Sequence, residues 1–179
     1  SMVAVDFFKG LIGSSHSVAD FPDDLSLPSL SNEDSSSLLF PFSAEDVLAT
    51  MKSLGKNKSP GPDGFTPEFF LKAWSIVGLD VSNAILHFFS TGHLPRSVNS
   101  SAIALVPKQS NASSMQHFRP ISCCNTVYKC ISKMISYRMK PLMNTLISRN
   151  QGAFVSNRSI GDNVMLAQFL CRDYHISHG

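Results

Sequence analysis

The stretch "NKSPGPDGFTPEFF" at residues 57–70 joins a stiff loop to the apolar start of a helix. Pro60 and Pro62 fix φ and remove two backbone donors. Gly61 and Gly64 can supply positive φ, or a bare backbone that another group can approach closely. The stretch therefore predicts a tightly shaped loop, which is either a plain chain reversal or a place that holds a ligand.

Helical patterns lie on both sides of this loop. Ser43 is a suitable N-cap and Asp46 occupies the capping-box position, so a helix is expected from there until Gly55. After the loop, Thr66 should cap a second helix that has Pro67 at its first position. The loop is therefore expected to connect two helices directly.

Two strands are expected further along the chain. Gly78 should interrupt the second helix, and another helix should stop near Gly92. The β-branched, apolar segment "SSAIALVPK" at residues 100–108 then predicts a strand. The segment "FRPISCC" at residues 118–124 is the candidate second strand, joined to the first by a polar connector. We expect these strands to form a β-hairpin.

Helical spacing returns after the strands. Asn125 is expected to cap a long helix that Pro141 kinks or restarts, and a last helix is expected over residues 160–174. Because helices clearly outnumber strands, the predicted fold class is α+β and mainly helical, with a short antiparallel β-hairpin packed on helices.

The N-terminal region divides into two parts. Residues 1–15 predict an amphipathic helix that ends before Gly13 and needs a partner surface. Residues 16–42 are rich in Ser, Asp, Pro and Asn, and they lack periodicity as far as Leu39. We expect them to form an extended or partly mobile connector.

Composition limits the possible classes of protein. The chain has 179 residues and is 43% hydrophobic, which fits one domain or part of a larger one. No apolar run is long enough for a membrane span, and no secretory signal is visible. The four cysteines include no CxxC pair, so we expect reduced thiols, no metal site, and a nuclear or cytoplasmic location.

Charge is segregated along the chain. Residues 1–94 contain five Lys or Arg against eleven Asp or Glu, whereas residues 95–179 contain ten against two. A polyanion is the natural ligand of the basic half, because phosphate neutralisation drives sequence-independent nucleic-acid binding. The alternative is that the two halves attract each other or an acidic domain.

Three groups of cations are candidate phosphate ligands. Lys58 lies beside the two glycines, where positive charge and free amides would meet. Lys108 and Arg119 should lie at one end of the hairpin, where they could clamp a triphosphate or remain solvated. Further cations recur along the helix expected after Asn125. They form either a basic face or an ordinary solvated surface: Lys129, Lys133, Arg138 and Lys140.

The sequence contains no motif that is typical of a hydrolase. The six histidines form no HExxH pattern, and no GxSxG nucleophile elbow occurs. Asp63 is better explained as a turn-stabilising side chain than as a catalyst. The sequence therefore gives no support for a hydrolase.

Four motifs, taken in their order along the chain, resemble those of a known protein family. "NKSPGPDGFTPEFF", "ALVPK", "FRPISCCNTVYKCISKMISYRMKPLM" and "LISRNQGAFVSNRSIGDNVMLAQFL" follow one another. Together they resemble the N-terminal part, extension plus fingers, of the reverse transcriptase of non-LTR retrotransposons (long interspersed elements), especially those of plants. The resemblance implies an N-terminal extension at residues 43–95, and truncated fingers with the start of the palm of a right-hand polymerase at residues 96–179.

The resemblance also implies roles for individual residues. Lys108 and Arg119 would bind the incoming nucleotide. The template contacts would come from the loop and from the QxxFxxGR motif, in which Asn157 replaces the usual glycine: Lys58, Gly61, Pro62, Asp63, Gly64, Phe65, Gln151, Phe154 and Arg158. Asn tolerates positive φ, so the turn at this substitution can survive.

The resemblance implies an incomplete enzyme. The family holds Mg²⁺ on aspartates of motifs that are absent here, and Asp162 and Asp173 are the only acids in the last 85 residues. We therefore expect no catalytic or metal-binding residue in this sequence and no polymerase activity from it alone, with Mg²⁺ required only by the complete polymerase.

Partners follow from the same interpretation. RNA template or an RNA/DNA primer-template is expected, together with the missing palm and thumb or another protein. The alternative function is a host-recruited retroelement remnant that binds protein or RNA and self-associates as a homo-oligomer.

Overall fold

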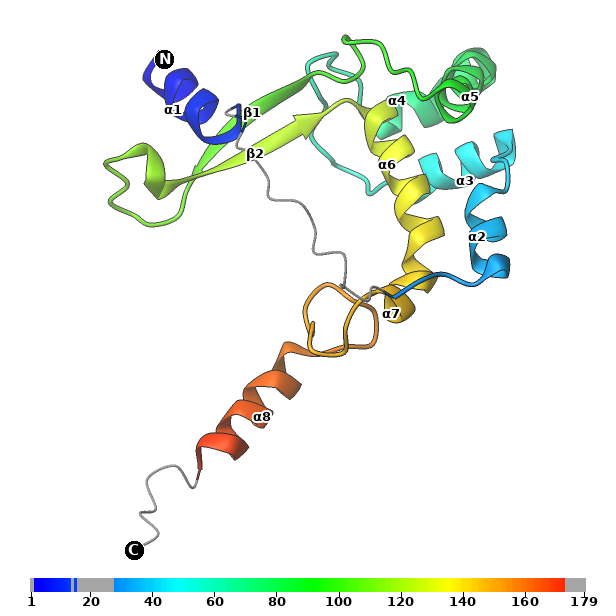
Figure 1. The fold of residues 1–179 in the computed structure, drawn as a ribbon. Coiled ribbons are helices and arrows are strands. Elements are labelled where there is room, and N and C mark those ends of the chain that lie inside the picture. The colour runs from blue at the N-terminus through cyan, green and yellow to red at the C-terminus, as the bar shows by residue number, and fades with distance from the viewer. Residues whose placement is uncertain (1, 14, 16–27, 173–179) are drawn as a thin grey trace, which may run out of the picture.

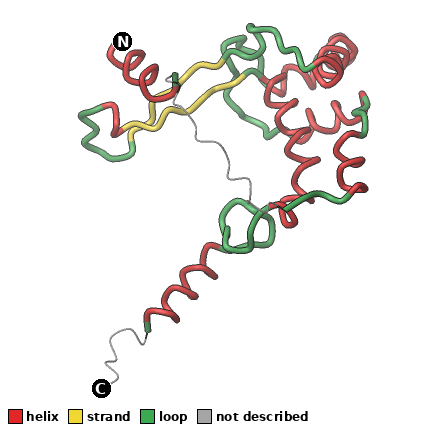
Figure 2. Tube along the Cα trace, viewed as in Figure 1, coloured by secondary structure: helices red, strands yellow, loops and turns green. Residues whose placement is uncertain are grey.

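Helices make up most of the fold, with one two-stranded sheet (Figure 1, Figure 2). The computed structural model describes residues 2–13, 15 and 28–172. Its elements in chain order are α1 (Met2–Ile12), α2 (Asn32–Leu39), α3 (Ala44–Ser53), α4 (Pro67–Lys72), α5 (Trp74–Thr91), β1 (Ser101–Pro107), η1 (Met115–His117), β2 (Phe118–Cys124), α6 (Thr126–Met139), η2 (Lys140–Leu142), α7 (Met143–Leu146) and α8 (Ile160–Cys171). The predicted mainly helical α+β class is confirmed.

The core lies where α3, α4, α5 and α6 meet. Val47 and Met51 of α3 are completely buried against Ile85 of α5 and Met134 of α6. These residues stand at helical spacing in the sequence, so each helix presents an apolar stripe to the others. The loop at residues 54–66 runs along the side of this core, between α3 and α4.

Local capping sets the boundaries of α3 and α4. Ser43 Oγ accepts a hydrogen bond from the Asp46 amide at 3.2 Å, and Asp46 Oδ2 accepts one from the Ser43 amide at 2.8 Å. Thr66 Oγ1 accepts from the Phe69 amide, with Pro67 in the first helical position. The predicted capping box and the predicted Thr66 cap are both confirmed.

The break predicted at Gly78 is wrong. The break falls at Ala73, and α5 then runs through Gly78 until Gly92, whose φ of 71° ends the helix as expected. A Cβ on Gly78 would lie 2.7 Å from the indole nitrogen of Trp74. The glycine therefore makes room for a ring of its own helix and does not terminate it.

The two strands form the predicted antiparallel hairpin. Ser101 pairs with Cys124 at one end and Pro107 with Phe118 at the other. The helix α1 covers one face of this sheet, as Figure 1 shows, and its residues line an apolar cavity of about 530 Å³ together with Ile103 and Leu105. The hairpin is the partner surface that the amphipathic N-terminal helix required.

The connector prediction is wrong for its last part. Residues 16–27 lie outside the described residues, but Asn32–Leu39 forms α2. Ser31 Oγ caps this helix by accepting from the Asp34 amide at 3.1 Å. The Ser31 cap thus starts α2, although this helix has no buried residue. The C-terminal end of α2 is held by contacts with α6, which are described below.

The chain turns sharply after α6. Pro141 lies in η2, so the expected kink or restart at this residue is confirmed. A loop at residues 147–159 follows, and α8 then extends away from the other helices (Figure 1). The structure describes α8 as far as Cys171. The expected end of this helix, at residue 174, lies outside the described residues.

Candidate nucleic-acid interface

The PGPDGF loop (residues 60–65) is closed by its own hydrogen bonds. The Gly64 amide donates to the Gly61 carbonyl at 3.0 Å, and the Phe65 amide donates to Asp63 Oδ1 at 3.0 Å. Gly64 has φ 76°, which is the positive φ expected of a glycine here. Asp63 is the turn-stabilising side chain that the sequence indicated.

A buried amide side chain holds this loop in place. Asn125, 2% exposed, accepts from the Asp63 amide at 3.2 Å through Oδ1. Its Nδ2 donates to the carbonyls of Ser97, at 2.8 Å, and of Val98, at 3.2 Å. Asn125 precedes α6 as predicted, but its side chain does not cap that helix, because the amide is used to join the loop to the turn before β1.

Gly61 fits directly against this residue. A Cβ on Gly61 would lie 2.6 Å from the Asn125 Cα and nearer still to its amide nitrogen and Oδ1. Beside it, Thr126 Oγ1 donates to the Phe65 carbonyl at 2.7 Å. The glycine therefore serves close packing within the chain, and the exposed part of the loop is Pro62, Asp63, Gly64 and Phe65.

The amides of the loop are therefore already used. The amides of Asp63, Gly64 and Phe65 each donate within the chain. The expectation that free amides would meet a phosphate at this place is wrong for these three residues. A phosphate that approaches the loop would need a side-chain cation instead.

One lysine and one carboxylate hold the base of the loop. Lys129 Nζ donates to the Ser59 carbonyl at 2.6 Å, and the Asn57 amide donates to Glu68 Oε1 at 2.5 Å. That hydrogen bond from Asn57 is the main cause that holds the pKa of Glu68 below its ordinary value. Lys58 is exposed and lies along Gly55.

Two other basic residues of α6 bind the ends of neighbouring helices. Lys133 Nζ donates to the Ser53 carbonyl, the last residue of α3, at 2.5 Å. Arg138 donates to the carbonyls of Leu38 and Phe40 at the end of α2. These cations therefore neither form a free basic face nor remain fully solvated, because helix C-termini present unpaired carbonyls that attract positive charge.

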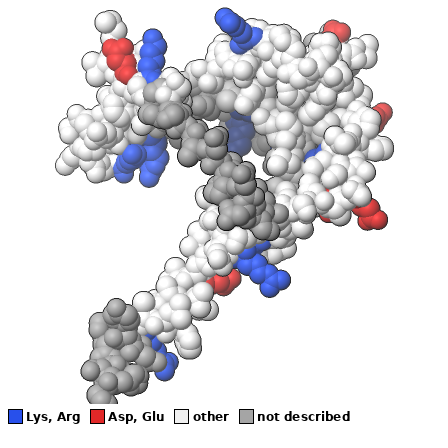
Figure 3. Space-filling view, viewed as in Figure 1, with Lys and Arg blue, Asp and Glu red and all other residues white. Residues whose placement is uncertain are grey.

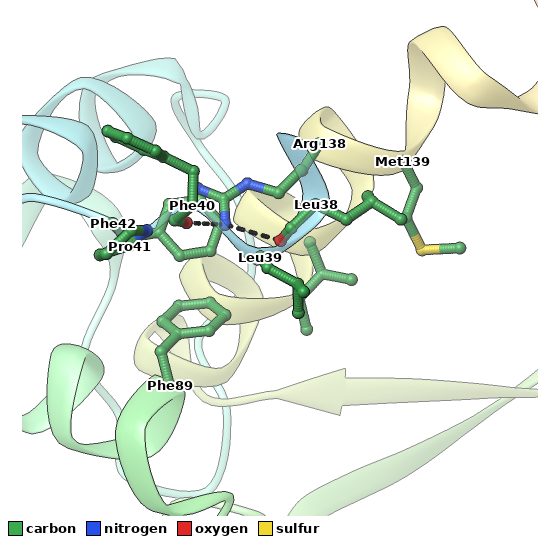
Figure 4. Close-up of a pocket in the computed structure, with 9 residues that line it drawn as sticks. Leu38, Leu39, Phe40, Pro41, Phe42, Phe89, Arg138 and Met139 are labelled. Carbon is green, nitrogen blue, oxygen red and sulfur yellow. Dashed lines mark hydrogen bonds between the residues drawn. The ribbon is translucent and has the colours of Figure 1, made fainter. Parts of the chain in front are cut away.

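Figure 4 shows how Arg138 makes these contacts. Its guanidinium lies over the ring of Phe42, 3.4 Å from the centroid, and points to the Leu38 and Phe40 carbonyls. Phe89 of α5 packs on Phe42 with ring centroids 4.3 Å apart. A cavity of about 270 Å³ lies among these residues, and it marks where α2 meets the core.

Lys108 and Arg119 are brought together at the end of the hairpin. The Lys108 amide donates to the His117 carbonyl at 2.8 Å, two steps beyond the pair Val106–Arg119. Since side chains alternate across a strand, Lys108, Val106 and Arg119 share one face, opposite the face that α1 covers. Both cations are exposed, and Lys108 Nζ donates to the Gln116 carbonyl at 2.7 Å.

Arg158 orders the loop between α7 and α8. Its guanidinium donates to the carbonyls of Asn144, at 3.2 Å, Ile147, at 2.9 Å, and Gln151, at 3.1 Å, and also to that of Ser148. The carbonyls left open at the end of α7 are thus satisfied by one side chain. This arginine is occupied within the chain.

The other three residues of the QxxFxxGR pattern are placed differently. Gln151 Nε2 donates to the Ala153 carbonyl at 3.1 Å, so its side chain is used locally. Phe154 has φ 62° and its ring is fully exposed, which is an unusual conformation for a bulky residue. Asn157 has φ 64°, so this asparagine does take the left-handed conformation expected where the family has glycine.

The predicted site residues form three separate groups. The PGPDGF loop lies at the start of α6, and the Arg158 loop lies beyond its end, roughly 20 Å away along a 14-residue helix. The third group, Lys108 and Arg119, lies at the far end of the hairpin. The hairpin extends from α6 toward the same side of the molecule as α8 (Figure 1). No two of these groups share a hydrogen bond among the described residues.

Surface charge agrees with the segregation in the sequence. Figure 3 shows basic groups at the far end of the hairpin and around the loop before α8, and acidic groups along the opposite edge, over α2, α3 and α5. Within the described residues, no cluster of three or more His, Cys, Asp or Glu side chains could hold a metal ion. None of the described helices is long and apolar enough to cross a membrane.

Sequence reasoning missed Asn125 as the organising residue. An asparagine before a helix is typical of a cap, and that local explanation concealed its contacts with distant backbone. A signal was present in Gly61, because a glycine fixed between two prolines indicates a closely approaching partner.

Comparison with known proteins identifies relatives. No protein-family model matches the chain. Over 172 residues it is 32% identical to "Transposon TX1 uncharacterized 149 kDa protein" of Xenopus laevis. This match covers 95% of the chain and 13% of that protein. Over 131 residues it is 29% identical to "Retrovirus-related Pol polyprotein from type-2 retrotransposable element R2DM" of Drosophila melanogaster, covering 73% of the chain and 12% of that protein. The chain is therefore homologous to a small part of two transposon-encoded proteins.

Proposed function

We propose that residues 1–179 are the N-terminal extension and fingers of a non-LTR retrotransposon reverse transcriptase of the plant type, and that they bind template RNA and the incoming nucleotide. The observation that carries this proposal is the similarity along 95% of the chain to a transposon protein, together with similarity to a Pol polyprotein. Because the chain spans only 13% and 12% of these relatives, the activity of a whole polymerase is part of the proposal.

The hairpin is the proposed nucleotide contact. Lys108 and Arg119 share an exposed face of the sheet near its free end. Arginine offers a forked donor and lysine a point charge, so the pair can neutralise neighbouring phosphate groups of a triphosphate. The opposite face is occupied by α1, which leaves this face as the one that can meet a ligand.

Two exposed aromatic residues are the proposed base contacts of the template. Phe65 is 45% exposed beside the PGPDGF loop, and the ring of Phe154 is fully exposed. Base stacking on an aromatic ring is worth about 1–3 kcal/mol per base in single-stranded complexes. Gln151 and Arg158 support this site indirectly, by shaping the backbone that carries Phe154.

Nucleotide transfer is not assigned to these residues. Mg²⁺ in a complete polymerase requires a cluster of carboxylates, and the described residues contain none. We expect the polypeptide of residues 1–179 to bind RNA without extending a primer, and the palm and thumb of the polymerase to be its protein partners.

The test is a salt titration of binding to a labelled single-stranded RNA, measured by fluorescence anisotropy. We expect the logarithm of the affinity to fall linearly with the logarithm of salt concentration. An affinity that is unchanged between low and high salt would contradict RNA binding.

A separate titration tests the hairpin. The double variant Lys108→Ala with Arg119→Ala should weaken binding of a deoxynucleoside triphosphate, while RNA affinity changes less. Lys72→Ala is the matched control, since Lys72 is exposed in α4 and distant from the hairpin in the chain. Equal effects of the double variant and the control on triphosphate binding would remove the proposed role of the hairpin.

One observation favours a second candidate function, a host-recruited protein-binding module. Along α8, large apolar side chains are all at least half exposed: Ile160, Val164, Met165, Leu166, Phe169 and Leu170. A helix that is apolar around its circumference is normally buried. Light scattering separates the two functions, because self-association that does not change on addition of RNA would favour the module.

A further inference from the structure

We propose that Arg96 is an additional RNA-phosphate contact, which Asn125 places beside the PGPDGF loop. This inference rests on the proposed function, and it assigns a residue to the template site that neither the sequence motifs nor the comparisons indicated.

The loop cannot bind phosphate through the amides at its tip. The amides of Asp63, Gly64 and Phe65 donate to Asn125, Gly61 and Asp63 respectively. What the loop presents outward is proline, glycine, a carboxylate and the Phe65 ring. A sugar-phosphate backbone that passes over this surface therefore needs positive charge from a neighbouring segment.

The α6 cations near the junction already donate to carbonyls. Lys129 and Lys133 donate to the carbonyls of Ser59 and Ser53. At the other end of α6, Arg138 and Arg158 are held by the carbonyls described above. These side chains are held in position by their present acceptors, so only their remaining N–H groups could contact a phosphate.

Arg96 is free and lies on a fixed turn. Its side chain is exposed, and among the described residues it has no hydrogen-bond or ion-pair partner. The turn that carries it is closed by the amides of Val98 and Asn99, each of which donates to the Pro95 carbonyl at 3.0 Å. A guanidinium on such a turn can bind phosphate through two parallel hydrogen bonds.

Asn125 joins this turn to the loop. Its Oδ1 accepts from the Asp63 amide and its Nδ2 donates to the Ser97 carbonyl, the residue next to Arg96. Only the amide group of one side chain separates the two backbones. Arg96 is therefore carried on the same rigid junction as the exposed loop surface, with Lys56 and Lys58 as the exposed cations of the loop segment itself.

The experiment compares Arg96→Ala with Lys72→Ala in binding to a labelled single-stranded RNA at several salt concentrations. Both substitutions remove one positive charge from an exposed position, so a general charge effect is common to both. We expect Arg96→Ala to weaken binding by about three- to tenfold and to reduce the slope of log affinity against log salt by about 0.7. Arg96→Lys should recover part of the affinity and the full slope, and thermal unfolding should be the same for all variants.

The outcomes separate the two proposals. If the unmodified chain binds RNA with the expected salt dependence and Arg96→Ala behaves like Lys72→Ala, the inference about Arg96 is wrong and the proposed function stands. If the unmodified chain does not bind RNA, both are overturned.

Discussion

The backbone of Gly61 lies against the backbone of Asn125, although the two residues are 64 positions apart in the sequence. An added Cβ on Gly61 would lie 2.6 Å from the Asn125 Cα, a contact that real Cβ atoms do not make. The PGPDGF loop is therefore seated on the start of α6, and its conformation depends on that contact.

Substitution of Gly61 by alanine should destabilise the chain. The new methyl group would collide with backbone, which cannot move aside as a flexible side chain can, so we expect a loss of about 3 kcal/mol in the free energy of unfolding. Urea unfolding followed by circular dichroism measures it. Gly10→Ala is the control, because a Cβ there has no atom within 4 Å and favours the helix α1. Equal stability of the two variants would contradict the close contact.

Arg158→Ala should loosen the loop between α7 and α8. The substitution leaves the carbonyls of Asn144, Ile147, Ser148 and Gln151 without this donor. We expect amide hydrogen exchange to increase in residues 147–158 while α3 and α5 remain protected. Arg158→Lys should not restore protection, because lysine lacks the planar fork that reaches several carbonyls. Unchanged exchange in the loop of Arg158→Ala would mean that this arginine is available for RNA instead.

Arg138→Ala should release α2 from the core. The helix α2 has no buried residue, and its end is held by Arg138 through the Leu38 and Phe40 carbonyls and the Phe42 ring. We expect faster hydrogen exchange in Asn32–Leu39 and a loss of about 1–3 kcal/mol in the free energy of unfolding. Lys140→Ala, an adjacent exposed cation, should leave α2 unchanged. An equal effect of both substitutions would indicate a general charge effect.

Stability should fall at alkaline pH through Cys130. Burial in the core raises the pKa of this thiol from 9.0 to about 11. Since the unfolded chain loses this proton at lower pH than the folded chain, the stabilisation is complete below pH 9 and is lost as pH rises from 9 towards 11. Urea unfolding at several pH values should show this decrease, and Cys130→Ala should be less sensitive to pH over the same range.

Thiol labelling gives a second measurement of the same environment. Cys130 is completely buried, whereas Cys171 is exposed on α8. At pH 8 a maleimide should modify Cys171 rapidly and Cys130 only under denaturing conditions. Rapid labelling of Cys130 in the folded chain would contradict its burial in the core.

Much of the fold was predictable because its signals are local. Ser43 with Asp46, and Thr66 with Pro67, start helices through contacts within four residues of the chain. The hairpin follows from two successive strand segments that only a polar connector separates. Gly78 was misinterpreted because glycine ends helices in most sequences, whereas here the neighbouring Trp74 ring occupies the space beside it.

The candidate site was predictable only in part. Lys108 and Arg119 could be placed together, because the register of a hairpin follows from its two strands. The partners of Lys129, Lys133, Arg138 and Arg158 could not be predicted, since each binds backbone carbonyls, which every residue provides and which leave no pattern in the sequence. The template and nucleotide roles of the site residues stay predictions.

The sequence by itself determined where most helices and both strands begin and end, through caps, glycines, prolines and hydrophobic spacing. Only the tertiary structure decided what Asn125 does, because its side chain bonds to backbone 62 residues away at Asp63 and 28 residues away at Ser97. Capping and periodicity act over a few residues, whereas a buried amide takes whichever donors and acceptors the folded chain brings to it.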